Sequence, residues 1–220
     1  NRKVFLLTSE PYSIFMSECP YIDGVIIDKR LPRWNLFFLY KLKKLLTKYN
    51  FSKVFDLQNS SRTKFYRRFI LNNSEWSSSE TTLESGQKKH DFDKEPVLNR
   101  MEAQLKKSNI LTEYVKKIDL DWAIQVFSED IKQYTKKEYI LVFPFCSKKH
   151  QNKKWPFFKD LISIIKSEYK DNYSILIAPG QKEIEEANKL KAKTVLINGE
   201  AINIKMLISL ISKAKFIIAN

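Results

Sequence analysis

Short apolar runs alternate with amphipathic stretches in the first part of the chain. Lys3–Leu7 and Gly24–Asp28 have the length and apolar character of buried strands, and Lys53–Leu57 is a third. Between the second and third runs, Trp34–Tyr49 has the apolar period of a helix. Because strands that alternate with helices are typical of parallel sheets, this region predicts an α/β domain.

A long polar stretch, residues 72–95, interrupts the alternation. It is rich in serine and threonine and holds few large apolar residues. The pattern therefore predicts a long loop, and such loops inside a compact domain are commonly lids or mobile segments. The spacing of Leu98, Met101 and Leu105 then predicts a helix over Val97–Leu111.

A second alternating region starts near Tyr139, after a polar helical or linker segment at residues 128–137. Its apolar runs predict four strands with three amphipathic helices between them. The strands are expected at 140–143, 174–178, 194–197 and 216–219, and the helices at 156–168, 182–191 and 203–214. We therefore expect two α/β domains, residues 1–134 and 135–220, each with a parallel sheet.

The net charge of +14 raises the question of a nucleic-acid partner. The 39 basic residues divide into 20 in residues 1–110 and 19 in residues 111–220, with no dense basic block. Such a diffuse charge argues against nucleic-acid binding. It leaves open a general attraction to phosphates or to an anionic membrane surface.

Cysteine, histidine and apolar content exclude several other classes. Cys19 and Cys146 form no disulfide framework and no zinc motif, which favours a reducing, cytoplasmic location. His90 and His150 are isolated from other metal-ligating residues, so no metal site is expected. No apolar run reaches the roughly 20 residues that a bilayer-spanning helix requires.

The most informative segment joins the strand Tyr139–Phe143 to a helix that starts at Pro156. Pro144 ends the strand, Lys153 and Lys154 lie in the connection, and proline suits a first helical position. In a parallel sheet such a loop leaves the edge where ligands bind, and a helix amino terminus favours anions. The segment predicts a phosphate-bearing ligand, with solvated lysines as the alternative.

Five stretches resemble, in order, motifs of glycosyltransferase family 9, the lipopolysaccharide heptosyltransferases. They include the family's Asp-Leu-Gln segment and its Pro-Gly-Ala-Ser, spacer, Lys-Arg-Trp-Pro segment. Each is weak alone, but together they form a specific pattern over nearly the whole chain. The stretches are Phe55–Arg62, Pro144–Pro156, Ala178–Glu183, Gly199–Ile204 and Lys213–Asn220.

The resemblance implies an α/β chain with a GT-B fold, in which two Rossmann-like domains with parallel sheets face a cleft, both incomplete here. Residues 1–134 would be the acceptor-side domain without its first βα unit, and residues 135–220 a truncated nucleotide-sugar domain. The implied reaction transfers heptose from ADP-heptose to a lipopolysaccharide core or lipid A acceptor, with inversion and without a cofactor. The catalytic base is expected upstream of Asn1, so the fragment alone is expected to be inactive.

For the donor, the resemblance implies contacts from Ser147, Lys153, Glu183 and Ile202. Lys153 would neutralise the diphosphate, and Ser147 would offer it a hydroxyl and a backbone N–H. Glu183 would accept hydrogen bonds from the ribose, or else is a helix-start glutamate stabilised by the helix dipole. Ile202 would line the base pocket, or else belongs to the core.

For the acceptor, the resemblance implies contacts from Gln58 and Arg62, because a guanidinium suits phosphates or acidic sugars. Arg67 and Arg68 are weaker candidates on the following helix, and all four residues also fit an ordinary polar surface. A lipid-linked glycan acceptor implies peripheral contact with the inner face of the cytoplasmic membrane. Two alternatives stay open: a related transferase for another sugar or glycan, and a basic, non-catalytic nucleic-acid-binding protein.

Overall fold

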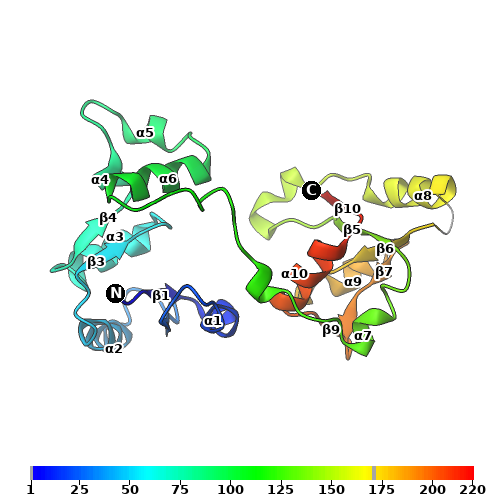
Figure 1. The fold of residues 1–220 in the computed structure, drawn as a ribbon, viewed down its shortest axis with the longest axis horizontal. Helices are drawn as coiled ribbons and strands as arrows, with labels where there is room; N and C mark the ends of the chain where they lie inside the picture. Colours follow the sequence, from blue (N-terminus) through cyan, green and yellow to red (C-terminus); the bar gives the residue numbers. More distant parts are fainter. Residues whose placement is uncertain (1, 170–171) are drawn as a thin grey trace. The chain divides into compact units, whose positions relative to one another are not determined.

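The computed structural model describes residues 2–169 and 172–220 and divides them into two compact units (Figure 1). The first unit holds the chain up to Ile14 together with Ile22–Asp119, and the second holds Phe15–Tyr21 with Leu120–Asn220. Residues 120–134, which the sequence grouped with the first domain, therefore pack within the second unit. None of the described helices is long and apolar enough to cross a membrane.

The first unit contains two pairs of parallel strands connected through helices. Strand β1 pairs with β2, and β3 pairs with β4. The last residues of α1 group with the second unit. The elements are β1 (Phe5–Thr8), α1 (Glu10–Ser17), β2 (Gly24–Ile27), α2 (Leu36–Thr47), β3 (Lys53–Phe55), α3 (Ser61–Phe69), β4 (Glu75–Ser77), α4 (Ser79–Thr82), α5 (Lys89–Phe92) and α6 (Val97–Lys107).

The core of the first unit forms where α2 and α3 pack on the strands. Leu42 and Leu46 of α2 are buried with Ile26 of β2, and Tyr66 and Ile70 join them from the region of α3. The helices begin where polar side chains cap their free N–H groups. The Asn35 carboxamide accepts from Phe38 N at 2.9 Å at the start of α2, and Ser60 forms a capping box with Thr63 at the start of α3.

Residues 72–95, expected to be a loop, contain β4, α4 and α5. The sequence of β4 lacks the apolar run that predicts a strand, because its buried residue is a serine. Ser77 is buried, and its backbone carbonyl accepts the Gln104 amide at 2.8 Å. Polar groups can be buried when hydrogen bonds satisfy them, so a strand of this kind has no hydrophobic signature.

The second unit is built around a four-stranded parallel sheet with the order β10-β5-β6-β7. The sheet elements are β5 (Tyr139–Phe143), β6 (Ser174–Ile177), β7 (Lys193–Thr194) and β10 (Phe216–Ala219), and β8 (Leu196–Ile197) pairs antiparallel with β9 (Glu200–Ala201). The helices are η1 (Asp121–Ala123), α7 (Glu129–Lys132), η2 (Lys148–Lys153), α8 (Phe158–Tyr169), η3 (Gln181–Glu183), α9 (Ile184–Ala187) and α10 (Ile204–Lys213).

Both faces of this sheet are covered, as its continuous apolar strands require. Leu141 and Leu176 belong to a core with α10, α7 and the segment before it. Their neighbours Ile140 and Ile175 belong to a second core with α8 and Ala187 of α9. Figure 1 shows the helices around the sheet. Successive residues of β5 and β6 thus point to opposite faces of the sheet, and helices cover both faces.

The expected strand at 194–197 and the expected helix at 182–191 are both divided in the structure. The strand becomes β7 and β8, and β8 turns into β9 through Asn198 and Gly199, which have φ values of 52° and 79°. Asn-Gly with two positive φ angles is the preferred two-residue hairpin turn. The helix is reduced to η3 and the single turn α9.

Candidate functional site

In the second unit, the loops after β5 and β6 leave the edge of the sheet where β10 ends, because these strands are parallel. Asn220, after the end of β10, is hydrogen-bonded both to the loop after β5 and to the last residue of β5. Trp155 N donates to the Asn220 carboxamide oxygen at 2.7 Å, and Asn220 N donates to the Phe143 carbonyl at 3.1 Å. Ligands of open α/β sheets bind at this edge.

The two adjacent lysines of the loop after β5 have different surroundings. Lys154 forms an ion pair with Glu186 of α9, and its ammonium lies 5.6 Å from the ring centroid of Phe145. Lys153 is exposed, and no carboxylate in the described part of the chain pairs with it. Lys154 therefore anchors the loop, while the Lys153 ammonium is available to an anion from solution.

Ser147 lies just before η2, where it helps to shape the same loop. Its backbone carbonyl accepts from His150 N at 2.8 Å and from the Gln151 side-chain amide at 3.3 Å. The residue itself is exposed. Ser147 and Lys153 thus lie at the two ends of η2, which is kinked at His150.

Glu183, the last residue of η3, is bound to the loop that follows β6. Its Oε2 accepts the Gly180 N–H at 2.9 Å, and that oxygen would lie 3.2 Å from a Cβ at position 180. A side chain there would crowd the carboxylate. One oxygen of Glu183 is therefore committed to the loop as a backbone cap. Contact of Glu183 with a ribose stays a prediction.

Ile202 lies between β9 and α10, half-buried against the core that contains Leu141. Gln181 connects this turn to the loop after β6, since its side-chain oxygen accepts Ala201 N at 3.0 Å. Glu183 and Ile202 therefore come from two segments that are tied together. The core contact of Ile202 matches the alternative foreseen for it, and contact with a base stays a prediction.

In the first unit, the predicted residue Arg62 takes part in a buried network at the carboxyl end of β2. Tyr66 donates its hydroxyl to Asp28 Oδ2 at 2.7 Å and accepts from Arg62 Nη1 at 2.8 Å. Arg62 Nη2 also donates to the carbonyls of Arg30 and Leu31, at 3.1 and 2.9 Å. Much of the guanidinium is thus used to hold the loop after β2.

The same network brings Gln58 beside Arg30. Arg30 Nη2 donates to Gln58 Oε1 at 2.7 Å, and Arg30 N donates to Asp28 Oδ1 at 2.8 Å. Arg30 has a φ of 52°, which is uncommon for a residue with a long side chain. Its backbone is held in that conformation by Asp28 and Arg62, so its exposed guanidinium is presented at the strand end together with Gln58.

Burial gives this network its electrostatic character. Tyr66 is only 2% exposed, and burial together with the nearby Asp28 carboxylate raises the pKa of its hydroxyl to about 12, against an opposing effect of Arg62. The phenol therefore stays protonated at neutral pH and keeps its donor for Asp28. The network can position charges, but its tyrosine cannot serve as a base near pH 7.

The ends of β3 and β4 are fixed to one another in a similar way. Buried Asp56 accepts the N–H groups of Gln58 and Asn59 at 3.1 and 2.8 Å. Asn59, with a φ of 51°, accepts Ser79 N on its side-chain oxygen at 2.7 Å. The side-chain amide of Gln104, on α6, donates to the carbonyl of Asp56 at 3.2 Å. This framework fixes the backbone around Gln58.

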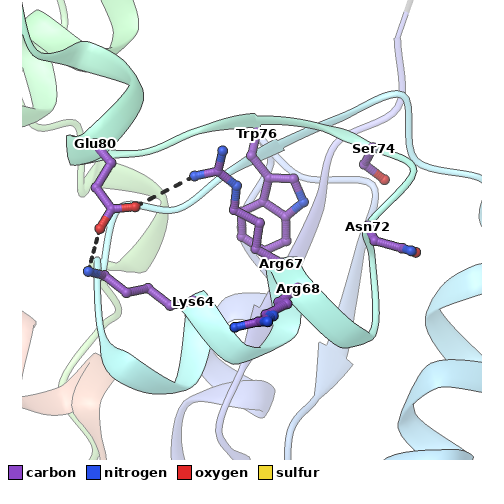
Figure 2. Close-up of a pocket in the computed structure, with 7 residues that line it drawn as sticks. All are labelled: Lys64, Arg67, Arg68, Asn72, Ser74, Trp76 and Glu80. Atoms are coloured by element: carbon purple, nitrogen blue, oxygen red, sulfur yellow. Dashed lines mark hydrogen bonds and ion pairs between the residues drawn. The ribbon is translucent and has the colours of Figure 1, made fainter.

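Arg67 and Arg68 lie elsewhere on α3, along an open pocket of about 490 Å³ (Figure 2). Glu80 pairs there with Lys64 and with Arg67 at 3.8 Å, and the Lys64 ammonium lowers the pKa of Glu80. The Trp76 indole forms part of the wall. The structure therefore places the two weaker acceptor candidates in a separate, partly neutralised pocket and not in the network of Gln58 and Arg62.

Sequence reasoning did not find Asp28, Arg30 or Tyr66. The only local signal was the basic turn that follows the strand ending at Ile27. The Asp28–Tyr66 bond joins residues 38 positions apart. Spacing along one element cannot report such a contact, because it depends on how α3 packs against β2.

Comparison with solved structures identifies the fold. The chain is similar to the S. aureus MnaA–UDP co-structure over 100% of its own length and 74% of that chain, with a TM-score of 0.55 and 14% identity. A crystal structure of UDP-N-acetylglucosamine 2-epimerase matches 98% of this chain and 74% of its own, with a TM-score of 0.50 and 14% identity. A putative UDP-N-acetylglucosamine 2-epimerase from Listeria monocytogenes matches 100% of this chain and 74% of its own, with a TM-score of 0.50 and 11% identity.

These likenesses and the parallel sheets place the chain among α/β proteins of the GT-B type, which confirms the predicted fold class. A search of curated proteins gave no match. Among protein families, residues 39–220 match glycosyltransferase family 9 (heptosyltransferase). The chain belongs to this family and is a glycosyltransferase by class, as the motif pattern indicated.

Proposed function

We propose that the protein transfers heptose from ADP-heptose to a lipid-linked lipopolysaccharide core acceptor, with inversion. The observation that carries the proposal is the family match over 39–220, described as heptosyltransferase. The loop after β5 supports it with an exposed Lys153, which pairs with no carboxylate among the described residues, at the ligand-binding edge of a parallel sheet. The reaction would take place at the cytoplasmic face of the membrane.

On the donor side, Lys153 stabilises the diphosphate as negative charge develops on the leaving nucleotide. Ser147 adds a hydroxyl from the other end of the same segment. Lys154 acts indirectly, because its ion pair with Glu186 fixes the loop. Glu183 contacts the ribose through the oxygen that does not accept the Gly180 N–H, and Ile202 lies beside the base. We assign no general base among the present residues.

On the acceptor side, Arg30 and Gln58 contact an anionic group of the acceptor glycan. Arg62 contributes mainly by position, since it holds the carbonyls of Arg30 and Leu31. A guanidinium whose backbone is already fixed loses little conformational entropy when it binds a phosphate or carboxylate. This assignment adds Arg30 to the residues that the family resemblance implied.

The donor site is tested by calorimetry of ADP-heptose, ADP and UDP with the full-length protein and its Lys153→Ala variant. Loss of one charge-assisted contact is expected to weaken ADP binding about 10- to 100-fold. Lys166→Ala, which removes an exposed lysine from the last turn of α8, is the matched control and should bind normally. Equal affinities of the two variants would remove Lys153 from the donor site, and tighter binding of UDP would overturn the ADP assignment.

The acceptor site is tested by steady-state kinetics with varied acceptor. Arg30→Ala is expected to raise the acceptor KM at least tenfold while the donor KM stays unchanged. Arg68→Ala is the control, because it removes an arginine from the separate pocket along α3. The opposite result, with the larger effect in Arg68→Ala, would move the acceptor to that pocket.

A further inference from the structure

Helix α2 has apolar residues on the face that does not pack against the core. Its inner side chains, Leu42 and Leu46, are buried. Around its start, however, four large side chains are between 64% and 83% exposed. They are Trp34, Leu36, Phe37 and Tyr40. A cluster of this kind in a soluble unit indicates an interaction surface.

The chain around this cluster is basic and contains no acid. Residues 29–55 hold eight basic residues and no aspartate or glutamate. In the described part of the chain, no carboxylate pairs with the three lysines that follow the cluster on α2, and the Lys41 ammonium lies 4.2 Å from the Phe37 ring centroid. The eight basic residues are Lys29, Arg30, Arg33, Lys41, Lys43, Lys44, Lys48 and Lys53.

We infer that this surface docks on the headgroup region of an anionic lipid bilayer. We define the α2 surface as Trp34, Leu36, Phe37 and Tyr40 with Lys41, Lys43 and Lys44. Tryptophan and tyrosine are suited to the membrane interface, where one end of the side chain is apolar and the other is wet. Lysines can extend their stems along the apolar side chains and place their ammonium groups at lipid phosphates.

The combination of apolar and basic residues favours lipid over the other occupants. A second copy of this surface would bring two sets of unneutralised lysines together, which is repulsive. Nucleic acid would use the lysines, but it offers no apolar layer to cover Leu36 and Phe37. An anionic bilayer provides both a negative surface potential and an apolar boundary at the depth such residues reach.

The position of the surface gives docking a use that rests on the proposed function. The connection from β2 to α2 carries Arg30, and Arg33 Nη1 donates to the Ser61 carbonyl at 3.5 Å at the start of α3. Docking through α2 would therefore hold the acceptor-side loops close to the headgroups. A lipid-linked acceptor could then reach Arg30 and Gln58 without leaving the membrane.

The experiment is flotation of the full-length protein with phosphatidylcholine vesicles, with and without phosphatidylglycerol. Binding is expected only to the anionic vesicles. Since each lysine near an anionic surface contributes about fivefold in affinity, Lys41→Ala/Lys43→Ala/Lys44→Ala should bind about 100-fold more weakly. Trp34→Ser/Phe37→Ser should lose at least tenfold.

Two matched controls separate this surface from general attraction. Lys189→Ala/Lys191→Ala/Lys193→Ala removes the same charge from exposed positions of the second unit, and Leu111→Ser/Tyr114→Ser removes exposed apolar groups elsewhere in the first. Both should bind like the unchanged protein. Equal losses in the two lysine variants, no flotation at all, or binding to duplex DNA but not to vesicles would each overturn the inference.

ADP-heptose calorimetry on the same α2 variants keeps the two proposals apart. Unchanged donor binding together with lost flotation is the expected result, because no donor residue lies on α2. If the full-length protein floats through α2 but does not bind ADP-heptose, the proposed function is wrong and the membrane surface stands. If it binds ADP-heptose but does not float, the membrane surface is wrong.

Discussion

Removing the Tyr66 hydroxyl is the sharpest test of the buried network at the end of β2. Tyr66→Phe keeps the ring among its core neighbours and deletes only the oxygen that donates to Asp28 and accepts from Arg62. Asp28 is 4% exposed, so water cannot readily replace the lost donor at Oδ2. Its other oxygen keeps the bond from Arg30 N.

The expected cost follows from these contacts. A buried carboxylate oxygen that loses its donor costs about 1–3 kcal/mol. The substitution removes only one oxygen atom from the core, so the packing of the ring adds little to this cost. We expect Tyr66→Phe to lower the free energy of unfolding of the first unit by about 2 kcal/mol. With a urea slope of about 1 kcal/mol per molar for a domain of this size, the midpoint should fall by about 2 M.

The assay is urea unfolding followed by fluorescence after Trp122→Phe and Trp155→Phe, which leaves Trp34 and Trp76, both in the first unit. Trp76 packs in the same core as Tyr66 and reports on its unfolding. Tyr114→Phe, at a tyrosine that is 70% exposed, is the control and should leave the midpoint unchanged. A double-mutant cycle with Asp28→Asn should give a coupling of at least 1 kcal/mol. Identical midpoints for Tyr66→Phe and the control would refute the argument.

Three further outcomes are expected from the fold. Burial raises the pKa of Tyr66 and of Tyr139 to about 12 from the ordinary 10; because the unfolded chain binds fewer protons between these values, stability should be full below pH 10 and fall as pH rises to 12. Ultraviolet titration should show that two tyrosines ionise only near pH 12, and that Tyr66→Phe and Tyr139→Phe each remove one of them. Ionisation of both tyrosines near pH 10 would contradict this. Gln104→Leu removes two buried hydrogen bonds and should cost about 2–3 kcal/mol, whereas a loss below about 0.5 would show that they contribute little. Asn203→Ala removes the cap of α10 and should cost about 1 kcal/mol in thermal unfolding, with Asn203→Ser close to the unchanged protein as the control.

The elements that were predicted correctly are those with a strong local signal. The strands over residues 139–143 and 174–177 are apolar on both sides because helices cover both faces, and short apolar runs report this directly. The run over 216–219 also forms a strand, β10, although Phe216 and Ile217 stay exposed. The helix at 204–213 has both an apolar stripe and an asparagine cap. Strand β4 gave no such signal because Ser77 is buried through hydrogen bonds.

The site residues also divide into those that local motifs predicted and those that only the folded structure revealed. The motif after β5 pointed to Lys153, and the Asp-Leu-Gln segment pointed to Gln58 and Arg62. Arg30 entered only through the folded structure, since its bond to Gln58 spans 28 positions. The basic residues divide almost evenly over the sequence, yet α2 gathers several beside exposed aromatic rings.

The sequence by itself determined the alternation of strands and helices, the family motifs and the lysine-bearing loop, because these depend on periodicity and on residues close together in the chain. Only the tertiary structure decided that Lys154 is paired while Lys153 is exposed, that Arg62 holds a loop, and that α2 keeps an apolar face open to solvent. The physical reason is that pairing and burial are properties of surfaces brought together from distant segments. The pattern along one element records which side is apolar, but not what will cover it.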